Sequence, residues 1–223
     1  MPLKGDLINL DLDGLGAKQY RVLSMNGDVA KVMAMYDYGN MSCHFSSTTI
    51  GTLKVAKYEG NTIDTFLNTT WYNRLTSAAR AAIVPESVVC DAWYDNNTGD
   101  PDYTNTNGTS ISKYAGSTLN IGERNVFALG IQDIIDYLND SSVQVDTTAI
   151  FRNVNIWKMF WNGEVPYYDR NLWLRSSYAI DEEYAWSIQS NSGVLYPNDL
   201  SNPRIVRPAL NLNLNKIEFT IVS

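Results

Sequence analysis

Two β-prone runs near the start of the chain flank an Asn-Gly pair. Residues Tyr20–Met25 and Asp28–Tyr36 are rich in apolar side chains, and Asn26-Gly27 separates them. Both central positions of a type I′ turn need a positive φ, which Asn and Gly adopt readily. The pattern therefore predicts a β-hairpin, with Val22 and Val32 on its buried side.

Further along the chain the spacing of apolar residues becomes helical. Apolar and aromatic side chains recur every three or four positions from Ile63 to Trp71, which predicts an amphipathic helix. Asn61 or Thr62 is expected to cap its start. A short Ala-rich helical turn, Ala78–Ala82, is expected to follow.

A second amphipathic helix is predicted over Ile131–Leu138. Isoleucines and Leu138 fall on one side of it, and Gln132, Asp133 and Asp136 fall on the other. Acidic residues near the start of a helix interact favourably with its dipole.

Short β-prone segments fill the last third of the chain. They are Leu172–Ser176, Tyr184–Gln189, Gly193–Tyr196, Val206–Leu214 and Ile217–Val222. Strands, then two helices, then strands again predict an α+β fold in which two amphipathic helices pack on short antiparallel sheets.

Residues 95–118 lack any periodicity and are rich in Asn, Thr, Gly and Asp. We interpret this segment as a long polar loop, and loops of such length in a compact domain usually carry function or are disordered.

Composition narrows the class of protein. No linker or internal repeat divides the sequence, so we expect one domain over residues 1–223. The net charge of −7 argues against binding to nucleic acid, which requires clustered Lys and Arg.

No apolar run approaches the ~20 residues of a membrane span, so we expect no membrane insertion. The start, Met1–Asp6, lacks an apolar segment, and we expect no signal peptide.

The chain also has frequent Asn, 14 Tyr and 6 Trp. Tyr, Asn, Ser and Gly are typical of adaptable recognition surfaces, but Asn and Gly are equally typical of turns, and composition alone leaves both interpretations open.

Cys43 and Cys90 are not part of a Cys-x-x-Cys pair, and His44 is the single histidine. Together they offer three ligands, whereas a structural zinc site needs four. Asp95, Asp100 and Asp102 have no regular spacing for calcium. We therefore expect no metal and no cofactor. Buried free thiols are our first interpretation of the cysteines, and a Cys43–Cys90 disulfide is the second.

An ordered set of motifs runs through the chain. In order, they are Asp64–Tyr72, Ala82-Ile83, Phe127–Leu129 with Asp133, Trp173–Ser176, Tyr184–Trp186, Gly193-Val194 and Val206–Leu210. From Gly5 to Val222 the chain resembles a bacterial and phage family with a C-type-lectin-like fold, which formylglycine-generating enzymes and the variable proteins of diversity-generating retroelements share. Leu67–Tyr72 and the segment Lys216–Thr220 are most similar to the phage-borne branch.

The motif residues have a physical interpretation of their own, as determinants of the fold. Large aromatic side chains anchor a core, and a charge within an apolar strand must be paired or must reach solvent. The residues that we expect to determine the fold are Trp71, Trp173, Arg175, Trp186 and Arg207. Partners considered for the arginines are Asp181, Glu182, Glu183, Asp64 and Asp133.

The resemblance implies a protein of the phage virion surface, made in the cytoplasm of the bacterial host, whose lectin-like domain binds a bacterial surface glycan or protein. It also implies contacts with other virion subunits and a homo-oligomer, a trimer by analogy with phage fibres. Aromatic rings stack on sugars, and Asn and Asp bind hydroxyl groups. The ligand-contacting residues that we expect are Trp93, Tyr94, Asp95, Asn96, Asn97, Tyr103, Asn105, Asn107, Tyr167, Tyr168 and Tyr178.

The alternative function is a capsid decoration or tail accessory protein with a mainly structural role. In that case residues 1–19 are an oligomerisation or virion-attachment segment whose strand, Leu7–Leu12, pairs with a neighbouring subunit. We favour its pairing with Ile217–Val222 of the same chain. We do not expect an enzyme, because formylglycine-generating enzymes use a C-terminal pair of cysteines, and no cysteine follows Cys90.

Overall fold

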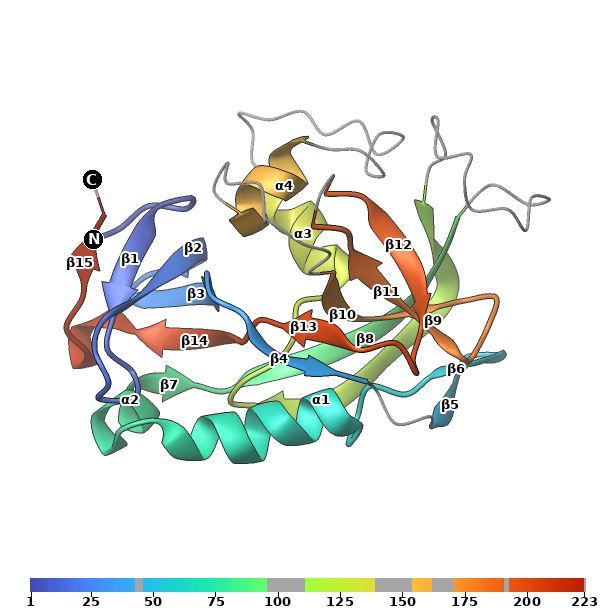
Figure 1. Ribbon diagram of the computed structural model, residues 1–223, viewed down its shortest axis with the longest axis horizontal. Coiled ribbons are helices and arrows are strands. Elements are labelled where there is room, and N and C mark those ends of the chain that lie inside the picture. Colours follow the sequence, from blue (N-terminus) through green and yellow to red (C-terminus); the bar gives the residue numbers. More distant parts are fainter. Residues whose placement is uncertain (43–45, 96–110, 139–153, 162–170, 191–192, 223) are drawn as a thin grey trace.

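A computed structural model describes residues 1–42, 46–95, 111–138, 154–161, 171–190 and 193–222 (Figure 1). It is an α+β structure, as the sequence predicts, and β-strands make up most of its regular elements. None of the helices in these ranges is long and apolar enough to cross a membrane.

The first sheet has six strands in the order β15-β1-β2-β3-β14-β7 and lies at the left in Figure 1. Its strands are β1 (Leu7–Leu10), β2 (Lys18–Asn26), β3 (Val29–Ala34), β7 (Ile83–Val84), β14 (Ala209–Asn213) and β15 (Thr220–Ile221). The predicted Asn26-Gly27 hairpin is confirmed, since β2 pairs with β3 and Gly27 has a φ of +59°. The pairing of β1 with the C-terminal strand is also confirmed.

The second sheet contains β12-β11-β10-β13-β4, with β8 between β10 and β9. The bounds of its strands are Tyr38–Met41 (β4), Glu86–Asp95 (β8), Ile111–Arg124 (β9), Leu172–Tyr178 (β10), Tyr184–Ile188 (β11), Leu195–Asp199 (β12) and Arg204–Val206 (β13). A separate hairpin joins β5 (Ser47–Ile50) to β6 (Leu53–Ala56). Our expectation of antiparallel sheets is wrong at β10, which pairs in parallel with both β13 and β8.

A continuous helical segment lies along one side of both sheets (Figure 1). It consists of α1 (Thr62–Thr65), the π-helix η1 (Phe66–Trp71) and the 3₁₀-helix η2 (Tyr72–Arg74), followed by α2 (Ser77–Ala82). The predicted cap is confirmed, because the Asn61 side chain accepts hydrogen bonds from the backbone N–H groups of Ile63 and Asp64. Trp71 projects from this segment into the core.

Helix α3 (Ile131–Leu138) has the predicted bounds and buries Ile131, Ile134 and Leu138. Helix α4 (Val154–Trp161), which the sequence analysis missed, packs beside α3. A last 3₁₀-helix, η4 (Leu214–Lys216), connects β14 to β15.

The five residues expected to determine the fold are all buried: Trp71, Trp173, Arg175, Trp186 and Arg207. Trp173 and Trp186 lie on the neighbouring strands β10 and β11, as expected.

Of the partners considered for the arginines, Asp133 is the one that binds Arg175, at 2.5 Å between Nη1 and Oδ2. Arg207 pairs instead with Asp37, which we had not considered, at 2.8 Å. Asp64 binds Arg124, and Glu182 binds Lys54.

Candidate functional site

Near its start, strand β9 contains a β-bulge at which its regular pairing with β8 is interrupted. Asp91 of β8 stands opposite Thr118, but Trp93 stands opposite Lys113. Residues Tyr114–Ser117 therefore face Ala92 alone. Such a bulge bends a strand and re-aims its side chains, and bulges are frequent next to functional sites.

The hydroxyl of Ser117 replaces the missing ladder bonds. Its Oγ accepts a hydrogen bond from the N–H of Ala92 (3.3 Å) and lies 2.6 Å from the carbonyl oxygen of Tyr114 and 3.0 Å from that of Ala92. A hydroxyl has one hydrogen and donates to one of these carbonyls at a time. Because Ser117 is fully buried, these bonds fix the shape of the bulge.

The bulge presents an aromatic ring to solvent. Tyr114 is 36% exposed, and its ring meets that of Tyr94 on β8 at 6.3 Å and 74°, an edge-to-face contact. Hairpin β5–β6 supports the bulge from the side. A Cβ atom at Gly51 would lie only 3.2 Å from the carbonyl oxygen of Gly116, whose φ is +74°. We call this region, Tyr94, Tyr114, Ala115, Gly116 and Gly51, the bulge surface.

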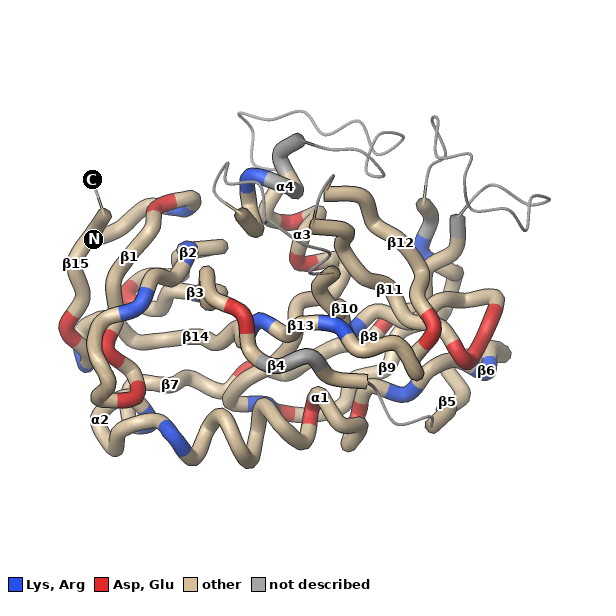
Figure 2. Tube along the Cα trace, in the orientation of Figure 1, with Lys and Arg blue, Asp and Glu red and all other residues tan. Residues whose placement is uncertain are grey.

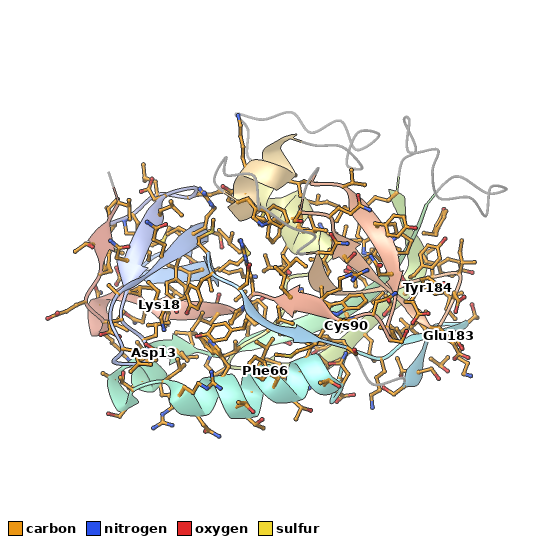
Figure 3. All side chains as sticks on the ribbon, in the orientation of Figure 1. Asp13, Lys18, Phe66, Cys90, Glu183 and Tyr184 are labelled. Carbon is orange, nitrogen blue, oxygen red and sulfur yellow. The ribbon has the colours of Figure 1, made fainter. Side chains whose placement is uncertain are left out.

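The turn between β10 and β11 begins at Ala179, which packs with Ile50 and Val55 of the β5–β6 hairpin. It contains Ile180, which is 63% exposed, and the acidic run Asp181–Glu183. Lys54 of β6 binds Glu182 at 2.8 Å, and the acidic turn lies beside β6 in Figure 2. Figure 3 places Glu183 at the end of the molecule opposite Asp13, so this end combines aromatic, apolar and acidic side chains.

Two of the expected ligand-contacting residues belong to the core. Trp93 and Tyr178 are each 5% exposed, so our expectation that they lie on ligand-binding loops is wrong. The carbonyl of Trp93 accepts hydrogen bonds from Trp186 Nε1 and from the backbone N–H of Ala179. Tyr178 packs edge-on against Trp186 at 5.7 Å. The parallel pairing of β8 with β10 buries both side chains.

Tyr94 is half-buried and packs against the cluster formed by Ile50, Val55, Ala92 and Ala179, and Asp95 is the last residue of β8. The other expected contacts lie outside the described residues: Asn96, Asn97, Tyr103, Asn105, Asn107, Tyr167 and Tyr168. Cys43, His44, Asp100 and Asp102 lie outside them as well.

The sequence analysis missed Tyr114, because it assigned residues 95–118 to a loop, whereas β9 begins at Ile111. Polar and apolar residues alternate over Thr118–Ile121, which is a strand signal directly after this segment, but the bulge at Tyr114–Ser117 interrupts the alternation.

Several titratable groups in the described ranges are buried and have shifted pKa values. Burial raises the pKa of the Cys90 thiol to about 12, which keeps it protonated and unreactive. Burial likewise raises the pKa of the phenols of Tyr20, Tyr36 and Tyr58 above the ordinary value. Within these ranges, no three Cys, His, Asp or Glu side chains group closely enough to hold a metal ion.

The buried carboxyl of Asp133 makes stability depend on pH. Burial raises its pKa, but the charges of Arg175 and Lys31 and a hydrogen bond from the N–H of Gly130 outweigh this effect, so the pKa lies below its ordinary value. A depressed folded-state pKa contributes stability that is present above the unfolded-state value of about 4 and is lost as pH falls through the folded value. We expect the urea midpoint to fall below about pH 4 and expect Asp133→Asn to flatten this acid limb. An unchanged acid limb in the variant would contradict this assignment.

Residues 46–214 match the family described as a domain of unknown function, DUF6273. No curated protein and no solved structure matches the chain. The matched segment contains the whole bulge surface and leaves out β1–β4 and β15.

Proposed function

This chain belongs to the DUF6273 family, and we propose that it is a non-enzymatic recognition module that binds a bacterial surface glycan at the bulge surface. The observation that carries the proposal is the exposed ring of Tyr114, held edge-on against Tyr94 by a hydrogen-bonded bulge. A ring with two side-chain torsions supplies contact area at a low cost in conformational entropy. Its apolar face is suited to stack on a sugar ring.

The surroundings of Tyr114 add hydrogen-bonding groups to this aromatic platform. Ala115, Gly116 and Thr52 are exposed, so backbone amides, carbonyls and a hydroxyl lie within the same region. A small number of placed polar groups around an apolar surface is the usual design of a ligand site.

Among the described residues, the state of Cys90, Asp133 and Arg175 supports recognition over catalysis. A catalytic nucleophile or acid–base pair needs a pKa matched to its task and access to a substrate. Cys90 is a buried thiol whose pKa is raised to about 12. Arg175 is buried and is bound to Asp133, whose side chain is 9% exposed. These groups hold the fold together.

We further propose that the domain is C-type-lectin-like and is carried on the surface of a phage particle. The support is the order of the tryptophan and arginine motifs together with an α+β arrangement in which helices pack on short sheets. Such a protein would contact other virion subunits and expose its recognition end to the bacterial cell.

A second candidate is a decoration or tail accessory protein, and the position of β15 as the outermost strand of the first sheet, among the described residues, favours it. The position of the protein in the particle separates the two functions. Tail-tip density favours recognition, whereas a regular lattice on the head favours decoration.

We expect Tyr114→Ala to weaken binding to an array of bacterial surface polysaccharides and to host cells about tenfold, equivalent to ~1.4 kcal/mol. The melting temperature should change by no more than a few degrees, because Tyr114 is partly exposed and Ser117 maintains the bulge. Binding is measured with fluorescently labelled protein.

The matched control is Tyr72→Ala, which removes a partly buried ring from η2, outside the bulge surface, and should leave glycan binding unchanged. Equal binding by Tyr114→Ala and the unmodified protein would contradict the proposed site. Binding to cells but to none of the polysaccharides would indicate a protein receptor.

A further inference from the structure

A groove lies on the first sheet, between the end of strand β1 and the segment that leads into β15, two elements at the left in Figure 1. Its volume is about 530 Å³, and it is lined by Asn9, Asp11, Ala17 and Ile217–Thr220. Sites for small ligands commonly have volumes of roughly 300–1,000 Å³. The groove therefore has room for a small organic ligand.

The alternation of side chains along β1 directs polar groups toward this groove. Ile8 and Leu10 are at most 1% exposed, so Asn9 and Asp11, which alternate with them, lie on the opposite face. Thr220 stands opposite Asn9 in the pairing of β1 with β15, and directly paired residues share a face. The Asn9 Nδ2 group donates a hydrogen bond to Thr220 Oγ1 at 3.4 Å. Two segments from opposite ends of the chain thus present polar side chains to one groove.

Two carboxylates give the groove a negative charge. Asp11 and Glu218 are both exposed, and the described residues that line the groove include no lysine or arginine. Lys18 follows a lining residue in the sequence, but it forms an ion pair with Asp13, so its charge is already compensated. Asp11 Oδ1 accepts a hydrogen bond from the N–H of Gly14 at 2.8 Å. This bond orients the carboxylate and leaves its second oxygen available to a ligand.

We propose that this groove binds a glycan that carries a free amino group. When protonated, such an amine donates charge-assisted hydrogen bonds to Asp11 and Glu218, and these are stronger than hydrogen bonds between neutral groups. The amide of Asn9 and the hydroxyl of Thr220 supply donors and acceptors for the hydroxyl groups of the sugar. The apolar residues of the lining offer surface to the C–H groups of the sugar ring.

The charge of the groove distinguishes this ligand from other occupants. Two carboxylates repel an acidic polysaccharide, and a neutral sugar leaves both of them without a cation. Calcium needs about six to eight oxygen ligands, and among the described residues no three Cys, His, Asp or Glu side chains group closely enough to hold a metal ion. An amino sugar uses the carboxylates, the amide and the hydroxyl together.

The groove is separate from the bulge surface. Figure 1 places β1 and β15 at the end of the molecule opposite the β5–β6 hairpin. The residues that line the groove lie outside the segment 46–214 that matches the family, whereas the bulge surface lies inside it. Binding at the groove therefore requires no contribution from the bulge surface, and it gives the protein a second site for glycans.

Isothermal titration calorimetry with a trimer of glucosamine, at about pH 6, tests this site. We expect binding that weakens with added salt, and the N-acetylated trimer, which lacks the charge, should bind at least about tenfold more weakly. Glu218→Gln and Asp11→Asn each remove one carboxylate without changing the size of the side chain, and each should weaken binding at least about fivefold. The matched control, Glu123→Gln, removes an exposed carboxylate from β9 and should leave binding unchanged.

Chemical-shift mapping with ¹⁵N-labelled protein locates the sugar, and we expect the largest changes at the backbone amides of Ala17, Glu218 and Thr220. Absence of binding, or equal binding by Glu218→Gln and the unmodified protein, would overturn the inference. Equal affinity for putrescine, a diamine without a sugar ring, would overturn the assignment to a glycan. Loss of binding in Tyr114→Ala but not in Glu218→Gln would place the sugar at the bulge surface and overturn the groove as its site.

Discussion

Replacing Arg175 with alanine is expected to lower the free energy of unfolding by about 3 kcal/mol or more, the usual cost of breaking a buried ion pair from one side. The guanidinium is buried and lies 2.5 Å from Asp133 Oδ2. It also donates to the backbone carbonyls of Ala128 (2.7 Å) and Val89 (2.9 Å). Its loss leaves these acceptors without their donor. Lys31, whose Nζ lies 3.3 Å from Asp133 Oδ1, still compensates part of the Asp133 charge in this variant. The loss in free energy of unfolding should therefore stay below the ~5 kcal/mol at the upper end of the range for broken buried ion pairs.

The position of Arg175 explains why this side chain matters. It lies on β10 and binds β8 through Val89, the segment before α3 through Ala128, and α3 itself through Asp133. One residue therefore connects two strands of the second sheet with the helix that covers them. Urea unfolding followed by tryptophan fluorescence measures the change, with the slope used to check that unfolding remains two-state.

Two comparisons make this expectation specific. Arg80→Met removes an exposed arginine from α2 and should change stability by less than about 0.5 kcal/mol. The double variant Arg175→Met/Asp133→Leu removes both buried charges and should be more stable than Arg175→Ala, because no carboxylate remains uncompensated. If the free energy of unfolding of Arg175→Ala lay within about 1 kcal/mol of that of the unmodified protein, the Arg175–Asp133 ion pair would contribute little to stability.

Local signals account for the elements that could be predicted from the sequence. The Asn26-Gly27 turn needs only the backbone preferences of two residues, and its hairpin is present. The helix Ile131–Leu138 follows from the spacing of its isoleucines. Asn61 caps α1 because its side chain reaches the N–H groups two and three residues ahead. None of these features depends on a distant part of the chain.

The bulge surface could not be predicted, because it depends on contacts between distant segments. The residues that follow Trp93, which are Tyr94, Asp95 and Asn96, are typical of a polar loop. The pairing of β8 with β10 nevertheless buries the Trp93 side chain. The bulge of β9 interrupts the two-residue period that would have marked the strand. The choice of Asp133 for Arg175, among several acidic candidates, likewise depends on the packing of α3 against β10.

Trp173→Ala is expected to have the largest effect of all and to abolish soluble expression. Trp173 is 1% exposed on β10, the strand between β11 and β13. Truncating a buried aromatic side chain to alanine costs about 3–5 kcal/mol through lost burial and the cavity that remains. The indole Nε1 also donates to the carbonyl of Met41 at 2.9 Å in a partly buried contact, and the loss of such a hydrogen bond adds about 1 kcal/mol.

These costs approach the 5–15 kcal/mol that stabilises a typical domain, and the lost bond to Met41 also loosens β4, the neighbour of β13. Trp173→Phe separates the two contributions, because it keeps most of the aromatic volume but lacks the N–H group. We expect this variant to fold with a lower urea midpoint. Soluble Trp173→Ala protein with a cooperative transition near that of the unmodified chain would show that β10 does not depend on this side chain, and the role of the tryptophan motif in the fold would have to be assigned to other residues.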